Sequence, residues 1–307
     1  MELRHLRYFL AVAEELHFGR AAARLHIAQP PLSQQIQQLE RELGYALFLR
    51  TQRRVRLTEA GAAFRAEARS ILERLEQAAA AAGRVARGEA GSLAVGFVAS
   101  ATFALLPRLY RRFRERQPGV ALSLEELSTA EQVEALRAGR IQVGLARPPV
   151  GDDSLEAEPL ADEPLVAALP ARHPLARRGA LPLRALADEP FVLFPRHPRP
   201  GWIDVVREAC RSAGFRPAVA QEVLELSTAV TLVAAGIGVT LVPASAQGLR
   251  LDGVAYRALR APAPRTRLVA LRRPEERRAT VDRFLEVVRE LTGARAGEGR
   301  RRAALAP

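Results

Sequence analysis

The stretch from Phe18 to Leu43 most constrains how this chain can fold, because it reads as two helices joined by a short turn. Its first part, residues 20–25, is rich in alanine, and small side chains allow a second helix to pack close. Its second part carries apolar residues at helical spacing, which predicts a buried stripe formed by Leu32, Ile36, Leu39 and Leu43. Gln29 is expected to cap this second helix, and Pro30 and Pro31 suit its first turn.

The opposite face of the second helix is polar, hardly charged and rich in amides. It carries Ser33, Gln34, Gln37, Gln38 and Arg41. Glutamine and arginine side chains can pair with adenine and guanine edges in a major groove that admits a helix. The pattern favours a helix-turn-helix whose second helix reads DNA, and the alternative is a solvated helical hairpin.

Basic residues follow this helix pair at close spacing, namely Arg50, Arg53, Arg54 and Arg56. Phe48, Val55 and Leu57 are interleaved with them, so residues 47–57 read as two short strands around a polar turn at 51–52. Such a hairpin is a wing, placed to touch phosphate or the minor groove. Phosphate contacts fix register on the duplex, while base contacts specify sequence.

Thr58 is a good N-cap for a long helix that follows without proline. Apolar residues recur along it at steps of four and three, at Phe64, Ala68, Ile71, Leu75, Ala78, Ala82 and Val85. This heptad spacing predicts a two-stranded coiled coil and hence a homodimer, and the alternative is a helix packed on its own domain. Gly83, Gly88 and Gly91 are expected to end the helix and form a hinge.

From Ser92 onward, predicted strands alternate with predicted helices, which implies an α/β fold with a parallel sheet. One of these helices is expected to be interrupted by Pro107. A second α/β lobe inserted into the first would create a cleft suited to a small molecule. The expected segments are a DNA-binding domain at 1–58, a linker helix and hinge at 59–90, an effector domain at 91–293 and a disordered tail at 294–307. Lobe I is expected at about 91–161 and 267–293, and lobe II at about 162–266.

The whole-chain composition bounds the function. A length of 307 residues suits two or three units, and a net charge of +12 favours a polyanionic partner. The single cysteine, Cys210, indicates a reducing compartment and is expected to be a buried structural thiol. The N-terminus lacks a signal-peptide pattern, and no apolar run approaches the length of a membrane span. The protein is therefore expected in the cytoplasm, without a membrane partner.

Enzyme signatures are missing from the sequence. None of its five histidines stands at a metal-ligand spacing, and no HExxH, CxxC or Walker pattern occurs. The GIG at 236–238 is not a GxGxxG motif. The sequence therefore predicts no enzyme, no cofactor and no metal site, and a nonspecific architectural DNA binder would not need a cleft domain.

Nearly the whole chain resembles the LysR-type transcriptional regulators. The likeness is carried by MELRHLRYFLAVAEELHFGRAAARLHIAQPPLSQQIQQLERELGYALFLRTQRRVRLTEAG, and further on by GFVAS, LPRLYRRF, ELSTAEQVEALRAGRIQVGLAR and VAAGIGVTLVPAS. The wording IAQPPLS is similar to the subgroup that controls catabolism of aromatic compounds. The resemblance implies a winged helix-turn-helix, a dimerising linker helix and a two-lobed domain like periplasmic binding proteins. It also implies a homotetramer, built as a pair of dimers, that bends promoter DNA.

Residue by residue, the resemblance assigns the start of the recognition helix to Gln29, Pro30, Pro31 and Ser33, and the wing to Arg50, Arg53 and Arg54. Many members have arginine at the position of Gln34, so its amide removes one charge from the DNA face. In the effector domain, the matching positions are Ser100, Thr129, Arg147 and Trp202.

These four effector positions also have ordinary structural alternatives. Ser100 and Thr129 are expected at helix starts, where hydroxyls and N–H groups suit a carboxylate, or they are plain N-caps. Arg147 either neutralises an acid or braces the hinge, and Trp202 lines the cleft rim or belongs to the core. The expected effector is a carboxylated aromatic-pathway metabolite. The alternative is a ligand-independent repressor with a vestigial binding domain.

Overall fold

The computed structural model describes residues 1–50, 54–194, 202–293 and 301–302. The chain divides into two compact units, Met1–Arg84 and Val85–Pro307, and each is described here by itself. The predicted wing turn at 51–52, Arg53, the loop before Trp202 and nearly all of the predicted tail lie outside the described residues.

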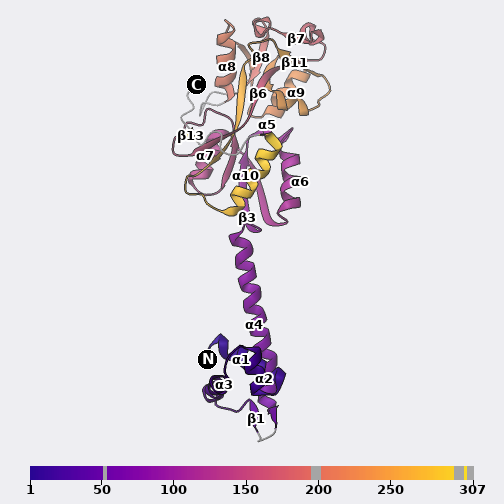
Figure 1. Cartoon of the computed structure of the whole chain (residues 1–307). Coiled ribbons are helices and arrows are strands. Elements are labelled where there is room, and N and C mark those ends of the chain that lie inside the picture. Colours follow the sequence, from indigo (N-terminus) through magenta and orange to yellow (C-terminus); the bar gives the residue numbers. More distant parts are fainter. Residues whose placement is uncertain (51–53, 195–201, 294–300, 303–307) are drawn as a thin grey trace. The chain divides into compact units, whose positions relative to one another are not determined.

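The first unit contains the predicted winged helix-turn-helix (Figure 1). Its elements are α1 (Leu3–Glu15), α2 (Phe18–Arg24), α3 (Gln29–Leu43) and the antiparallel strands β1 (Phe48–Arg50) and β2 (Val55–Leu57). α2 begins earlier than predicted because the His17 side chain caps it, accepting a hydrogen bond from the Arg20 amide. The expectation that Gln29 caps α3 is wrong: Ala28 is the N-cap residue and Gln29 is already helical, whereas Pro30 and Pro31 do occupy the first turn.

Aromatic rings hold the core of this unit. Phe9 contacts Phe48 and Phe64 with ring centroids 5.4 and 5.0 Å apart, and Phe18 lies 5.9 Å from Phe48. The predicted apolar stripe of α3 is buried among them at Leu32, Ile36 and Leu39. Because these rings come from α1, α2, β1 and the following helix, one cluster fixes the helix pair, the wing and the start of the linker.

The linker helix α4 (Glu59–Ala86) starts as predicted, with the Thr58 hydroxyl accepting a hydrogen bond from the Gly61 amide at 2.8 Å. Its apolar stripe divides into two parts. Phe64 and Ala68 pack into the core of the first unit, whereas Ile71 and Leu75 are exposed. Gly83 lies inside the helix, so the prediction that it ends the helix is wrong.

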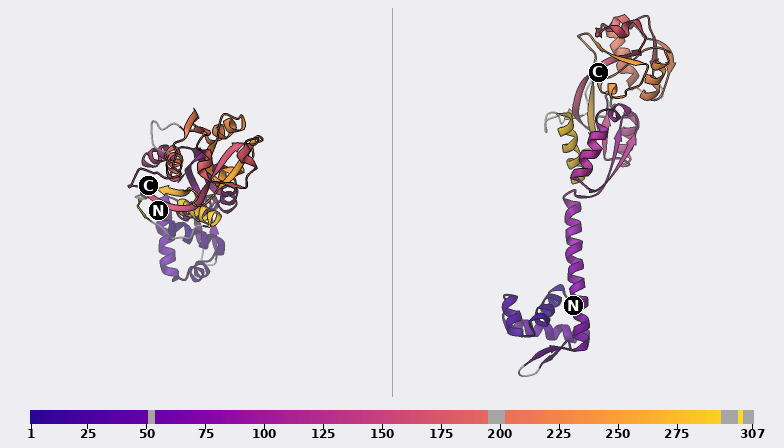
Figure 2. Two further views of the ribbon diagram at one scale, coloured as in Figure 1. Left: turned by 90° about the horizontal axis from the view of Figure 1, so that it is seen from above. Right: turned by 90° about the vertical axis from the view of Figure 1, so that its right-hand side faces the viewer.

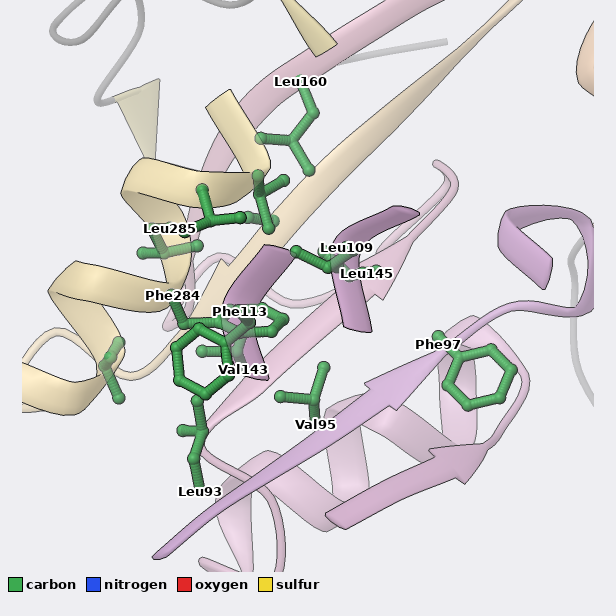
Figure 3. Close-up of a cluster of buried hydrophobic side chains, with 14 of the residues drawn as sticks. Leu93, Val95, Phe97, Leu109, Phe113, Val143, Leu145, Leu160, Phe284 and Leu285 are labelled. Atoms are coloured by element: carbon green, nitrogen blue, oxygen red, sulfur yellow. The ribbon is translucent and has the colours of Figure 1, made fainter. Parts of the chain in front are cut away.

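Lobe I of the second unit has the predicted parallel sheet, with strand order β4 (Gly119–Glu126), β3 (Ala90–Phe97), β5 (Val143–Ala146). Its helices are α5 (Ala99–Thr102), α6 (Leu106–Arg116), α7 (Thr129–Arg137) and α10 (Ala279–Thr292). Pro107 sits in the first turn of α6 and does not interrupt a helix as predicted, because that turn needs no N–H donor from it. Helices α6 and α10 meet at Phe113 and Phe284, whose ring centroids are 5.4 Å apart, above Leu93 and Val95 of β3 (Figure 3).

Strand β6 (Glu156–Pro170) runs through both lobes (Figure 1 and Figure 2). Its first part, up to Pro164, pairs with β12 (Arg265–Arg272), and its last part, 165–170, pairs with β10 (Thr240–Pro243) and β11 (Val254–Leu259). The chain thus enters lobe II along β6 and returns to lobe I between β11 and β12.

Lobe II is completed by helices on both faces of its strands. They are α8 (Trp202–Ser212), α9 (Leu226–Ala234) and the short 3-10 helices at Pro174–Arg177, Leu183–Leu186 and Ala244–Gly248. A small parallel pair is formed by β8 (Pro190–Leu193) and β9 (Ala218–Glu222), and β7 (Ala180–Leu181) pairs with β11. In lobe I, β13 (Arg301–Arg302) pairs with the start of β6. α8 and α9 pack on separate apolar clusters, so lobe II has a core on each side of its sheet.

Gly61 provides a test of how the linker helix joins the wing. A Cβ at this position would lie 2.1 Å from the Leu47 carbonyl oxygen, so Gly61→Ala must displace the start of β1. We expect the melting temperature of the first unit to fall, with a loss of about 1–3 kcal/mol that outweighs the gain in helix propensity of about 1 kcal/mol. Calorimetry of the full chain measures this, with Ala63→Gly as the propensity control, and a rise for Gly61→Ala would contradict the close packing.

Candidate DNA-binding face and effector site

The polar face of α3 is open to solvent. Gln29, Pro30, Pro31, Gln34 and Gln37 are all exposed, and Ser33 is half-buried. The predicted DNA-contacting side chains of α3 thus lie along one accessible face of a helix whose other face is buried.

Both flanks of α3 are tied to neighbouring elements. On one flank, the buried His5 of α1 lies 2.8 Å from the Gln35 side-chain oxygen through its Nε2 atom. On the other flank, Arg50 of β1 donates from Nη2 to the Glu40 carboxylate at 2.8 Å, and its guanidinium carbon lies 4.9 Å from the centre of the Phe18 ring. Sequence reasoning missed Glu40, which reads as an ordinary surface charge near the end of the helix.

Of the predicted wing residues, Arg50 is therefore already engaged inside the first unit. Arg54 is exposed just before β2, and Arg53 lies outside the described residues. The antiparallel pairing of β1 with β2 places Arg50 opposite Val55.

In the second unit, the structure brings Ser100, Thr129 and Arg147 together. The Ser100 hydroxyl accepts a hydrogen bond from Nε of Arg147 at 2.8 Å. The Thr129 hydroxyl donates to the Arg147 carbonyl at 2.8 Å and accepts from the Arg147 amide at 3.2 Å. Their elements explain this meeting, because Ser100 follows β3, Thr129 follows β4 and Arg147 follows β5, three parallel strands that end at the same edge.

Neither hydroxyl residue is an ordinary N-cap. Val98 is the N-cap residue of α5, so Ser100 is already inside that helix. Ser128 caps α7, and its side chain accepts a hydrogen bond from the Glu131 amide. The hydroxyls of Ser100 and Thr129 are thereby left to hold Arg147.

Arg147 links the two lobes from a buried position. Only 7% of the residue is exposed, and its Nη2 atom donates to the carboxylate of Glu163 in β6. Glu163 also accepts hydrogen bonds from the amide and hydroxyl of Ser245 in lobe II, at 2.6 and 3.1 Å. Burial lowers the pKa of the Arg147 guanidinium, and the Glu163 charge opposes that shift.

One donor of this guanidinium is unused. Nη1 of Arg147 is buried and has no hydrogen-bond partner among the described residues. A buried donor without a partner costs about 1–3 kcal/mol, so the site favours any acceptor that can reach this atom.

Sequence reasoning missed Glu163 and Ser245, and it placed Trp202 with the other three effector positions. The one signal for Glu163 is an acid inside the strand run DEPLVAAL. Trp202 starts α8, packs on the core of lobe II and donates from Nε1 to the Leu241 carbonyl at 3.3 Å. Within the described part of the chain, no hydrogen bond joins it to Ser100, Thr129 or Arg147.

The remaining chemical groups give no sign of a reactive centre. Cys210 is buried in lobe II, and desolvation raises the pKa of its thiol to about 12, so the thiol stays protonated. Among the described residues, no cluster of three or more histidine, cysteine or acidic side chains is arranged to hold a metal ion. No helix in the same residues is both long and apolar enough to cross a bilayer.

A winged helix-turn-helix unit joined to a two-lobed α/β unit defines a class of DNA-binding regulators. Residues 3–62 match the family described as bacterial regulatory helix-turn-helix protein, lysR family, and residues 86–293 match the LysR substrate binding domain. The chain belongs to the LysR family of transcriptional regulators and is not an enzyme, which confirms the predicted family and fold class.

Individual relatives support the same assignment. The chain is 45% identical over 260 residues to the HTH-type transcriptional regulator AlsR of Bacillus subtilis, which covers 84% of this chain and 86% of AlsR. The crystal structure of CbnR, a LysR family regulator, superimposes with a TM-score of 0.82 at 35% identity, covering 94% of this chain and all of CbnR. Full-length CbnR in complex with its target DNA matches with a TM-score of 0.81 at 33% identity, covering 95% and 100% of the two chains.

The buried ion pair provides a stability test. Glu163→Gln keeps the side-chain shape but leaves the Arg147 charge without its carboxylate, which we expect to lower the free energy of unfolding of the second unit by about 3 kcal/mol. Urea unfolding followed by Trp202 fluorescence measures this. The control is Asp162→Asn, whose exposed pair with Arg265 contributes less than about 1 kcal/mol. Equal losses in the two variants would show that the Arg147–Glu163 pair has no special role.

Proposed function

We propose that this regulator binds a carboxylate effector at Ser100, Thr129 and Arg147 and transmits that binding to sequence-specific DNA recognition. The observation that carries the proposal is the unpartnered Nη1 donor on a buried, charged guanidinium. A solvated hinge brace would not need to hold such a donor away from water.

The chemistry of the site favours a carboxylate over a neutral ligand. Arginine presents parallel N–H donors that match the two oxygens of a carboxylate, and such pairs are stronger when they are removed from water. An incoming carboxylate reaches Nη1 directly and competes with Glu163 for Nη2, while Ser100 supplies a neighbouring hydroxyl. Since Glu163 also binds Ser245, this competition changes the link between the lobes.

A ring-derived acid or a diacid from aromatic catabolism is the effector class that we propose. The sequence of residues 27–33 resembles that of the subgroup that controls such pathways, and Arg147 supplies one positive charge that can bind one carboxylate. The competing proposal is a ligand-independent repressor with a vestigial second unit. A titration with carboxylates separates the two.

On DNA, we propose that the amide face of α3 reads bases while the wing contributes backbone contacts. Gln34 and Gln37 are exposed and carry the donor and acceptor that match an adenine edge. The solved complex of CbnR with its target DNA supports a DNA-bound form of this fold. Promoter DNA is accordingly the proposed macromolecular partner, with Gln29, Pro30, Pro31, Ser33, Arg53 and Arg54 at the interface.

The exposed apolar residues of α4 support dimerisation through this helix. Ile71 is 45% exposed and Leu75 38% exposed, although both continue the heptad stripe that Phe64 and Ala68 begin inside the core. A second copy of α4 is the partner that a heptad stripe fits. We propose a homodimer through this helix, and a homotetramer formed by two such dimers.

Fluorescence of Trp202, the single tryptophan, tests the effector site. Titration with a panel of aromatic acids and ring-cleavage diacids should give saturable quenching by at least one compound. Ser100→Ala removes one hydroxyl that holds Arg147 and should weaken the binding of that compound about tenfold. Tyr110→Phe, on the exposed surface of α6, serves as the control. Absence of any response, with DNA binding intact, would favour the vestigial domain.

The α4 interface is tested by replacing one of its apolar residues with a charged one. Leu75→Arg places a charge on the proposed seam, which loses about 1.5–3 kcal/mol of apolar burial per chain and adds repulsion. Sedimentation of the full chain should then give an oligomer with half the wild-type mass. Glu73→Arg, an exposed position outside the stripe, should leave the mass unchanged. A wild-type mass for Leu75→Arg would place the dimer contact elsewhere.

A further inference from the structure

The carboxylate of Glu40 joins the DNA-reading helix to the wing. It lies in the last turns of α3 with its side chain 15% exposed, and both of its oxygens are used. Oε1 accepts hydrogen bonds from the amides of Leu47 and Phe48, at 2.8 and 3.0 Å. Oε2 accepts from Nη2 of Arg50 at 2.8 Å. One side chain on α3 thus holds the backbone where β1 begins, at Leu47 and Phe48, and the side chain of Arg50 at the end of that strand.

Arg50 is held on its other sides as well. Its guanidinium carbon lies 4.9 Å from the centre of the Phe18 ring of α2, and Nη1 makes a long contact of 3.5 Å with the Ser33 hydroxyl on α3. The side chain is 30% exposed. The arginine therefore spans from the wing to both helices of the helix-turn-helix.

The wing depends on such contacts because its two short strands are not stable without the rest of the unit. Strands β1 and β2 have three residues each and form a separate two-stranded sheet. A two-stranded ribbon of this length is marginal by itself. Its position relative to α3 is therefore set by what the strands pack on and by the hydrogen bonds to Glu40.

We propose that Glu40 is a positioning residue for DNA recognition, which holds the wing against the reading helix through Leu47, Phe48 and Arg50. Arg50 acts in this arrangement as a strut inside the protein, and its guanidinium is not the wing's phosphate contact. The inference rests on DNA binding by the first unit and adds a role that an acidic side chain beside a polyanion would not otherwise have.

The sign of the effect separates positioning from simple electrostatics. If Glu40 were only a negative charge near the duplex, its removal would reduce repulsion and tighten binding. If it positions the wing, its removal weakens binding although a repulsive charge has gone. The salt dependence of binding distinguishes a structural role of Arg50 from a phosphate contact. Each phosphate contact contributes about 0.9 to the slope of log affinity against log salt concentration, so loss of a strut leaves the slope unchanged.

The experiment uses the full chain and a fluorescent duplex that the wild-type protein has selected from a randomised pool. Affinity is measured by anisotropy over a series of salt concentrations for Glu40→Gln, Arg50→Ala and the control Glu42→Gln. Glu42 lies two residues further along α3, and among the described residues its carboxylate pairs with the N-terminal amine and Gln38. Its removal deletes a similar charge and leaves the wing untouched.

We expect Glu40→Gln and Arg50→Ala each to weaken binding about tenfold with no change in the salt slope, and Glu42→Gln to bind as tightly as wild type or tighter. Wild-type or tighter binding by Glu40→Gln would overturn the proposal, and so would a slope reduced by about 0.9 in Arg50→Ala. Failure of the wild-type protein to select any duplex would instead count against sequence-specific binding itself.

Folding of the variants is checked by calorimetry of the first unit. If Glu40→Gln lowers its melting temperature to near the assay temperature, Arg50→Ala decides alone, because it leaves the bonds from Glu40 to Leu47 and Phe48 in place. Arg50→Lys, which keeps the charge but loses the planar fork, should bind more weakly than wild type with an unchanged slope. Full affinity in Arg50→Lys would show that the charge alone matters.

Discussion

The continuity of β6 is the constraint on which the second unit depends. One strand of fifteen residues supplies the pairing partner for β12 in lobe I and for β10 and β11 in lobe II. β6 exchanges one set of partners for the other between Pro164, which pairs with β12, and Leu165, which pairs with β10. Glu163 and Pro164 stand next to that exchange, and Glu163 is the residue that binds Arg147 on one side and Ser245 on the other. The proposed ligand site is thus placed where the backbone changes partners.

The two units use arginine in a similar way. Arg50 binds the Glu40 carboxylate and lies against the Phe18 ring, and Arg147 binds the Glu163 carboxylate and the hydroxyls of Ser100 and Ser245. Their side chains are 30% and 7% exposed, and Arg272 is comparably buried in its ion pair with Glu156. A guanidinium suits such contacts between elements because it is planar, permanently charged and able to donate hydrogen bonds in several directions.

Much of this architecture was predictable from sequence. The stripe of Leu32, Ile36 and Leu39 gave the reading helix, and the strand-helix alternation after Ser92 gave a parallel sheet, because both signals are local. Parallel strands end at one edge, which explains why Ser100, Thr129 and Arg147, each following one of these strands, meet in the structure. The details that failed depend on contacts distant in sequence. Strand β6 continues through Pro159 and Pro164, two residues that disfavour a strand, and the pairing with β12 accommodates them with a register shift between Leu268 and Val269.

The capping of α2 by His17 and the roles of Glu40 and Glu163 were hidden for a related reason. Each acidic residue reads as a surface charge in its own segment, and only the tertiary fold shows that its partners come from another strand or loop. The role that the resemblance assigns to Trp202 stays a prediction, and its indole hydrogen bond is made within lobe II.

The unpartnered Nη1 donor of Arg147 has a consequence for the lifetime of the protein. A ligand that binds only the folded state raises its stability by about 2.7 kcal/mol at a concentration of 100 times its dissociation constant. That gain is comparable with the roughly 1–3 kcal/mol that an unsatisfied buried donor costs. Proteases degrade the transiently opened chain, so the effector proposed for this site would slow degradation of the regulator as it accumulates. Under this proposal the amount of the regulator, and not only its activity, would rise with the effector concentration.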